Sequence, residues 1–157
     1  MDDPPELLEV RGLEVCFSSA EGPPARALRG VDLNLAGGQS LALIGESGSG
    51  KSGLGLALMR LLPPSAQLEG SVRVLGEECL GASDGSLRRL RGGVSAMIFQ
   101  HPQAALNPVM KVRKQVAEAA WARGMSRREA LTRAEGLLEE VGPGGLPRPC
   151  YPHQLSG

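Results

Sequence analysis

The sequence predicts an α/β fold in which a glycine-rich loop joins a buried strand to a helix. Three observations support this prediction. An apolar run of strand length, residues 41–44, leads directly into the glycine-rich residues 45–50. Residues 52–62 follow as a helix, which Pro63-Pro64 ends because proline cannot continue a helix. Alternating apolar stretches on both sides of this unit predict further strands.

The loop of this unit fits the phosphate-binding pattern G-x-x-x-x-G-K-[ST]. Backbone N–H groups in the first helical turn lack intrahelical partners, and the helix dipole adds partial positive charge, so the turn suits an anion. Glycines let the backbone curl around phosphate groups. Lys51 is expected between the β- and γ-phosphates of a nucleotide and the Ser52 hydroxyl on Mg²⁺. The predicted binding residues are Gly45, Glu46, Ser47, Gly48, Ser49, Gly50, Lys51 and Ser52.

The flanking residues 1–40 and 70–76 predict a mainly antiparallel sheet. Apolar residues nearly alternate along 8–17, and the break at Arg11-Gly12 predicts a strand with a bulge. Residues 31–35 alternate cleanly and read as a second strand. The glycine-bounded stretch 70–76 alternates again, so it is assigned to the same sheet.

The second half of the chain predicts one strand and several helices. Residues 94–99 form an apolar run, and Gln100 stands at its end, where open α/β sheets place ligand contacts. Val112 to Arg123 reads as a helix. Ser126 and Glu129 form a capping box that opens another helix. The apolar face of that helix comprises Ala130, Leu131, Ala134, Leu137, Leu138 and Val141.

The composition disfavours several classes of function. Seventeen basic and seventeen acidic residues cancel, so no global field attracts nucleic acid. Arg88, Arg89 and Arg91 are expected to form a solvated face. No apolar stretch reaches the ~20 residues of a membrane span, so a membrane role would need a partner. The three cysteines favour reduced structural thiols over zinc binding, and His101 and His153 are expected in turns rather than as metal ligands.

Three segments together resemble the ATP-binding subunit of an ABC transporter. They are the P-loop, the block Ile-Phe-Gln-His-Pro-Gln-Ala-Ala-Leu-Asn-Pro at 98–108, and Tyr-Pro-His-Gln-Leu-Ser-Gly at 151–157. The LNP block and the YPH lead-in are most similar to the branch that energises dipeptide, oligopeptide or nickel import. The resemblance covers essentially the whole chain. It implies an α/β P-loop NTPase fold of the ABC type, with an N-terminal antiparallel β subdomain, a partial RecA-like core and a helical insert.

The resemblance also implies a division of residues 1–157, as a partial nucleotide-binding domain. The antiparallel β subdomain would comprise 1–40 and 70–76, the P-loop strand and helix 41–62, the Q-loop strand 94–100, and the helical subdomain 101–157, up to the start of the signature motif.

Further site residues follow from the same resemblance. Phe17 matches the aromatic residue that stacks on adenine, although at strand spacing it is equally compatible with the sheet core. Gln100 matches the Q-loop glutamine, which contacts Mg²⁺ and the attacking water and senses the transmembrane partner. Ser156 and Gly157 match the start of the signature motif, which caps the γ-phosphate held by the opposite subunit; alone, Ser156 would be a helix cap.

The implied function is ATP hydrolysis, with ATP and Mg²⁺, coupled to import of a small solute such as a peptide or nickel. The implied partners are transmembrane permease subunits, a second ATP-binding subunit in a homo- or heterodimer and, indirectly, an extracytoplasmic solute-binding protein, but no nucleic acid. The implied location is the cytoplasmic face of the membrane.

Two family motifs, the Walker B strand and the switch histidine, do not occur in these residues. We therefore expect the chain to be part of a longer or interrupted gene product and to be inactive alone. We also expect strand 41–44 to be exposed, because its parallel neighbours are missing. The alternative is a truncated, non-catalytic nucleotide-binding remnant. An ABC ATPase acting on DNA is disfavoured because zinc-type cysteine pairs and long heptad runs are absent. The contexts of Gln100 and of residues 155–157 disfavour a kinase-type enzyme.

Overall fold

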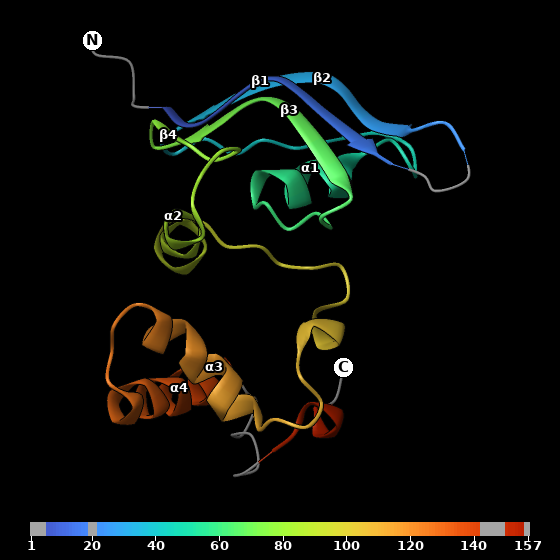
Figure 1. Cartoon of the computed structure of the whole chain (residues 1–157). Coiled ribbons are helices and arrows are strands. Elements are labelled where there is room, and N and C mark those ends of the chain that lie inside the picture. The colour runs from blue at the N-terminus through green and yellow to red at the C-terminus, as the bar shows by residue number, and fades with distance from the viewer. Residues whose placement is uncertain (1–5, 19–21, 142–149, 156–157) are drawn as a thin grey trace. The chain divides into compact units, whose positions relative to one another are not determined.

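The computed structural model describes residues 6–18, 22–141 and 150–155. The chain divides into two units, Met1–Arg91 and Gly92–Gly157. The first unit contains the sheet and the second is helical (Figure 1). The α/β class and the antiparallel sheet predicted from the sequence are confirmed. Among the described residues no helix has the length and apolar character needed to cross a membrane.

The first unit is built on a four-stranded antiparallel sheet (Figure 1). The strands are β1 Glu6–Phe17, β2 Ala25–Ala36, β3 Ala66–Val74 and β4 Glu77–Glu78, in the spatial order β2-β1-β3-β4. β1 therefore pairs on both sides, with β2 and with β3. The predicted alternation of apolar residues is confirmed. Of the stretch predicted at 70–76, residues 70–74 join this sheet as part of the longer β3, and residues 75–76 form the turn before β4.

The predicted bulge lies in β1 at Arg11-Gly12. The register of β1 shifts between Val10 and Leu13 against β2, and between Arg11 and Glu14 against β3. Gly12 has a φ of 56°, and its N–H donates to Asp32 Oδ1 at 2.8 Å. The Asp32 side chain of β2 therefore accepts the hydrogen bond that the Gly12 N–H does not make to a strand backbone at the bulge.

Helix α1, Lys51–Leu58, covers one face of this sheet and closes the core (Figure 1). Alternation along the strands places their apolar side chains on that face. Leu54 and Ala57 of α1 are buried against them. Helix α2, Asp84–Arg89, precedes a π-helical turn, Leu90–Val94. These two elements contribute Leu87 and Leu90 to the hydrophobic core. The strands and the turn after β4 supply the other buried residues of the core, Val10, Leu13, Val15, Leu28, Val72 and Cys79.

We expect Gly70→Ala to destabilise the first unit. Gly70 of β3 has a φ of 101°, and a Cβ there would lie 2.5 Å from the carbonyl oxygen of Gly12 in the bulge. The positive φ and the displaced backbone should together cost about 1–3 kcal/mol of unfolding free energy. Urea unfolding measures this loss. Gly53→Ala, in α1 with open space around the new Cβ, is the matched control and should be neutral or stabilising. Equal midpoints for Gly70→Ala and wild type would contradict the packing described here.

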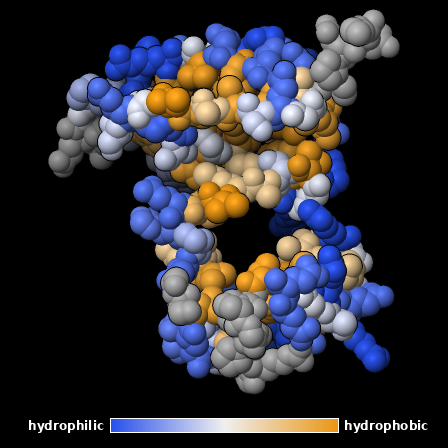
Figure 2. All heavy atoms as spheres, turned by 180° about the vertical axis from the view of Figure 1, so that it is seen from behind, coloured by the Kyte–Doolittle hydropathy of each residue, from blue (hydrophilic) through white to orange (hydrophobic). Residues whose placement is uncertain are grey.

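The strand predicted at 41–44 is not formed. Residues 39–46 have no strand pairing, and the side chains of Leu41, Leu43 and Ile44 are 51 %, 48 % and 95 % exposed. The reason is that the described part of the chain supplies no parallel neighbour for this segment, which agrees with the exposure expected from the sequence. Figure 2 shows hydrophobic residues on the surface of the molecule. The helix predicted at 52–62 begins and ends earlier, at Lys51 and Leu58.

The prediction of a strand at 94–100 is also wrong. Val94 ends the π-helical turn, and residues 95–99 pair with no strand in the described chain; the Ile98 side chain is 92 % exposed. A short apolar run needs a neighbouring strand to complete its backbone hydrogen bonds. Short 3₁₀ turns follow at Pro102–Ala105 and Pro152–Gln154.

The second unit is a helical hairpin of α3, Val112–Ala122, and α4, Arg127–Val141 (Figure 1). Ala117 of α3 packs on Ala130 and Ala134 of α4, as the predicted apolar face requires. Val141, which was assigned to the same face, is instead 77 % exposed. It is the last residue of α4, and a helix end has fewer neighbours to cover it.

The predicted capping box at the start of α4 is confirmed. The Ser126 N–H donates to Glu129 Oε2 at 3.2 Å and the Ser126 hydroxyl donates to the same oxygen at 2.5 Å. The Glu129 N–H donates in return to Ser126 Oγ at 3.4 Å. These bonds from Ser126 hold the pKa of the Glu129 carboxyl below its usual value.

Candidate functional site

The P-loop occupies residues 45–50 of the first unit, directly before α1. Gly48 and Gly50 have φ values of 83° and 94°, which residues with a Cβ rarely adopt. Gly50 is the N-cap of α1, and this helix has neither a side-chain cap nor an acidic residue in its first turn. The first N–H groups of α1 therefore stay available, and the positive end of the helix dipole is not neutralised locally. Such a helix start suits a phosphate group.

The loop packs closely on β2 at Gly50. A Cβ at this position would lie 2.8 Å from Leu28 Cδ2 and 2.9 Å from the carbonyl oxygen of Ala27. The sheet thus fixes the position at which α1 begins. Within the loop, a Cβ at Gly45 would lie 2.8 Å from Ser49 Oγ, so the turn is tight at its entrance as well.

Lys51 folds back over the loop. Its Nζ donates to the carbonyl oxygens of Gly45 and Glu46 at 2.8 and 2.6 Å, and to Ser49 Oγ at 3.1 Å. The three donors of one ammonium group are therefore shared among atoms of the loop itself. This arrangement concentrates the positive charge of Lys51 at the loop, next to the N-terminus of α1. A bound phosphate would share or replace these bonds.

The position of Ser52 suits a side-chain ligand of Mg²⁺ in a metal–nucleotide complex. Ser52 lies in the first turn of α1 and is exposed. In the described part of the chain no group of three or more His, Cys, Asp or Glu side chains could hold a metal ion by itself. Mg²⁺ commonly takes one or two protein ligands and completes its shell with water and phosphate oxygens. Ser52 would be the protein ligand in such a shell.

Phe17 ends β1, where it pairs with Ala25 of β2 and Ala66 of β3. Its side chain is half-buried and packs against the core of the first unit. This packing is enough to explain why a hydrophobic residue stands at position 17. The exposed part of the Phe17 side chain leaves room for an adenine ring to stack on it. The adenine contact stays a prediction.

The other predicted residues lie in the second unit or outside the described residues. Gln100 is exposed in a bend rather than at the end of a strand, so the strand that was expected to place it is absent. Since it belongs to the second unit, the geometry of the P-loop does not test its role. Ser156 and Gly157 lie outside the described residues. His101 and His153 are exposed in short turns, and the His153 ring stacks on Tyr151 with 5.9 Å between ring centroids.

Arg91 corrects one sequence interpretation. Arg88 and Arg89 are exposed, as expected of a solvated face, whereas the Arg91 guanidinium is half-buried and bonds to backbone carbonyls after α1. A signal for this difference was present in the sequence. Arg91 is four residues after Leu87 and adjacent to Leu90, so helical spacing places it near the buried face.

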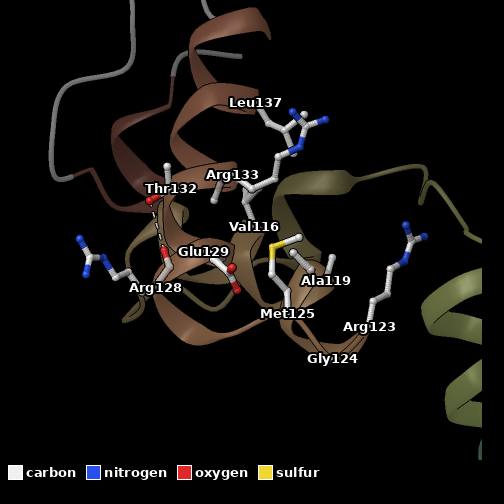
Figure 3. Close-up of a pocket in the computed structure, with 12 residues that line it drawn as sticks. Val116, Ala119, Arg123, Gly124, Met125, Arg128, Glu129, Thr132, Arg133 and Leu137 are labelled. Carbon is white, nitrogen blue, oxygen red and sulfur yellow. Dashed lines mark hydrogen bonds between the residues drawn. The ribbon is translucent and has the colours of Figure 1, made fainter.

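A groove runs along the α3–α4 hairpin of the second unit. Its volume is about 980 Å³, and Figure 3 shows the side chains that surround it. Val116, Met125 and Leu137 give it apolar surface, while three arginines, Arg123, Arg128 and Arg133, place positive charge at its rim. Figure 3 shows the side chains of Arg123 and Arg128 pointing away from the groove, and the Arg123 Nε donates to the carbonyl oxygen of Gly92. The single acidic residue in the lining, Glu129, is engaged by Ser126 in the capping box. The groove therefore suits an amphipathic surface with acidic residues.

Three comparisons relate the chain to known proteins. A family model described as ABC transporter matches residues 28–157. The oligopeptide transport ATP-binding protein OppD of Mycobacterium bovis is 42 % identical over 96 % of the chain. OppD of Bacillus subtilis is 39 % identical over 96 % of the chain, and the glutathione import ATP-binding protein GsiA of Salmonella typhimurium is 42 % identical over 99 %.

These relatives are much longer than the chain. The alignment covers 25 % of the Mycobacterium protein, 43 % of the Bacillus protein and 26 % of the Salmonella protein. A solved structure described as the dimeric post-hydrolysis state of an ATP-binding cassette with ADP and Pi superposes with a TM-score of 0.77 at 25 % identity. That match covers 95 % of this chain and 63 % of the other.

Proposed function

Because the chain belongs to the ABC transporter family, we propose that it is the ATP-binding part of an importer and couples ATP binding and hydrolysis to uptake of a small solute. The observation that carries this proposal is the P-loop geometry. An uncapped helix start and the Lys51 ammonium are held together on one tight glycine loop. This is the arrangement that a triphosphate requires.

The nucleotide would be bound by residues 45–52. Backbone N–H groups at the start of α1 would hold the phosphates, Lys51 would neutralise the β- and γ-phosphates, and Ser52 would be a ligand of Mg²⁺. The metal ion, when bound, neutralises developing charge on the phosphates. Gln100 would orient the attacking water and sense the permease. Ser156 and Gly157 would cap the γ-phosphate of a second subunit.

We propose as partners a second ATP-binding subunit, two transmembrane permease subunits at the cytoplasmic face of the membrane and, through them, an extracytoplasmic solute-binding protein. The dimeric state of the similar solved structure supports the first of these. The basic, partly apolar groove on α3 and α4 supports a permease contact at the helical subdomain, which we assign to residues 101–157. Charge complementarity then predicts acidic residues on the permease surface.

The solute is proposed to be a peptide, with nickel as the alternative. The relatives named for oligopeptide and glutathione transport support a peptide, since glutathione is itself a tripeptide. Uptake of labelled dipeptides, oligopeptides, glutathione and Ni²⁺ by cells with and without the gene would test this. Uptake of one of them should be lost in the deletion strain and should return with the wild-type gene but not with Lys51→Ala. Unchanged uptake of all four would contradict the proposal.

A second candidate is a nucleotide-binding module without catalytic turnover. It is favoured by one observation: these 157 residues contain no Walker B strand with its carboxylates and no switch histidine. We propose that the chain by itself binds ATP but does not hydrolyse it. The two candidates agree on ATP binding and differ on phosphate release.

Phe17→Ala is expected to weaken ATP binding by about 1–3 kcal/mol, the scale of base–aromatic stacking, without changing pyrophosphate binding. The reason is that an aromatic platform contacts the base, whereas the P-loop binds the phosphates. Calorimetric titrations with ATP and with pyrophosphate measure both affinities. If both fall equally, Phe17 acts through the sheet core that it already contacts and not through adenine.

A further inference from the structure

The C-terminal end of α1 is stopped by a backbone motif. The N–H of Arg60 donates to the carbonyl oxygen of Ala57 at 2.9 Å, and the N–H of Leu61 donates to that of Leu56 at 2.8 Å. Arg60 has a φ of 52°, in the left-handed region. This pair of bonds is a Schellman motif, in which glycine usually occupies the position of Arg60. The motif satisfies two of the last carbonyl groups of the helix.

Arg91 binds the carbonyl groups that follow. Its Nε donates to the Met59 oxygen at 2.8 Å, and its Nη2 donates to the Arg60 oxygen at 2.5 Å. One planar guanidinium thus spans two consecutive carbonyls, from a position 31 and 32 residues further along the chain. A positive charge at the negative end of the helix dipole adds to these bonds. The buried neighbours of Arg91, Leu87 and Leu90, hold its segment against the same core.

We propose that Arg91 is a positioning residue for nucleotide binding, which acts on the P-loop by capping α1 at the end opposite to the phosphate site. This proposal rests on the proposed nucleotide-binding function. Helix α1 has only eight residues, about two turns. Loss of its last turn would leave a single turn to hold the N–H groups that face the phosphates and to support the dipole. The cap therefore sets how well the binding end is preorganised.

The experiment compares the full chain with Arg91→Met, which keeps the length of the side chain and removes its donors. Arg88→Met is the matched control, because Arg88 is exposed and the charge change is identical. Gly70→Ala is a second control, since it is expected to destabilise the sheet and its new Cβ would meet the backbone of Arg11 and Gly12, not α1. Two quantities are measured for each variant: ATP affinity by calorimetry, and amide hydrogen exchange across α1 and the sheet.

Arg91→Met should lower ATP affinity roughly threefold to tenfold. It should also accelerate amide exchange at residues 55–61 by about tenfold while the amides of β1 and β3 keep their rates. Arg91→Lys should lie between wild type and Arg91→Met, because one ammonium cannot span both carbonyls as a guanidinium does. Arg88→Met should match wild type in both measurements.

The proposal would be overturned if α1 amides in Arg91→Met exchanged at wild-type rates, or if its ATP affinity equalled that of wild type. It would also be overturned if exchange rose equally in α1 and the sheet, as expected for Gly70→Ala, because Arg91 would then stabilise the unit only globally. Failure of the wild-type chain to bind ATP would instead refute the proposed function, while the exchange rates would still decide whether Arg91 caps α1.

Discussion

The 157-residue chain alone is expected to hydrolyse saturating Mg²⁺-ATP at no significant rate, with Lys51→Ala as the background control. Phosphoryl transfer to water needs the water to be oriented and the developing charge to be met by metal and cationic groups. The P-loop provides the cationic part through Lys51 and the start of α1. No Walker B carboxylate that would hold the other side of Mg²⁺ or orient the water is present in these residues.

The segment before the P-loop adds a second reason for low turnover. Residues 41–44 lie exposed without strand partners in the described chain, so the entrance of the loop is not held by a sheet. A misplacement of about 1 Å can lower a rate about 100-fold. We therefore expect a rate at least about 100-fold below the ordinary enzymatic scale of ~1 s⁻¹.

A continuous phosphate-release assay measures this rate. Joining a segment with the Walker B strand and the switch histidine should restore turnover and cover the exposed residues 41–44. If the 157-residue chain alone is monomeric, folds cooperatively and turns over at ~1 s⁻¹ or faster, the prediction is wrong.

Lys51→Ala is expected to lower ATP affinity roughly tenfold to a hundredfold, or ~1.5–3 kcal/mol. The substitution removes a charged donor to phosphate. It also removes the hydrogen bonds from Lys51 to Gly45, Glu46 and Ser49, which hold the loop together. Isothermal titration with Mg²⁺-ATP measures the change.

Lys114→Ala is the matched control for Lys51→Ala, because Lys114 is an exposed lysine of the second unit and the charge change is the same. It should bind ATP as wild type does. Ser52→Ala should weaken Mg²⁺-ATP more than metal-free ATP, because only the former uses the hydroxyl as a metal ligand. Equal ATP affinity for wild type and Lys51→Ala would contradict the role assigned to the P-loop.

Features with local causes could be predicted from the sequence. The capping box of Ser126 and Glu129, the bulge at Arg11-Gly12 and the alternating strands depend on residues close in the chain, and all three occur. The predictions of strands at 41–44 and 94–100 did not succeed. A strand exists only when another segment completes its hydrogen bonds, and an apolar run by itself cannot show whether such a segment is present.

For the candidate site, the sequence located the P-loop but not the contacts that shape it. The G-x-x-x-x-G-K-[ST] pattern places Lys51 and Ser52 at the start of a helix, and the helix does begin there. It could not show that Gly50 packs on Ala27 and Leu28 of β2, because that contact depends on tertiary structure. The partners of Arg91 could not be predicted for the same reason, since they lie 31 and 32 residues earlier in the chain.

The most direct test of the central claim, that the start of α1 binds the phosphates of a nucleotide, is an NMR titration of the backbone amides with ATP and with pyrophosphate. We predict saturable shifts that are largest at residues 48–52 for both ligands, since both offer phosphate oxygens to the same N–H groups. Additional shifts near Phe17 should occur with ATP alone. Shifts that are absent from residues 48–52, or that are centred on another part of the chain, would contradict the account.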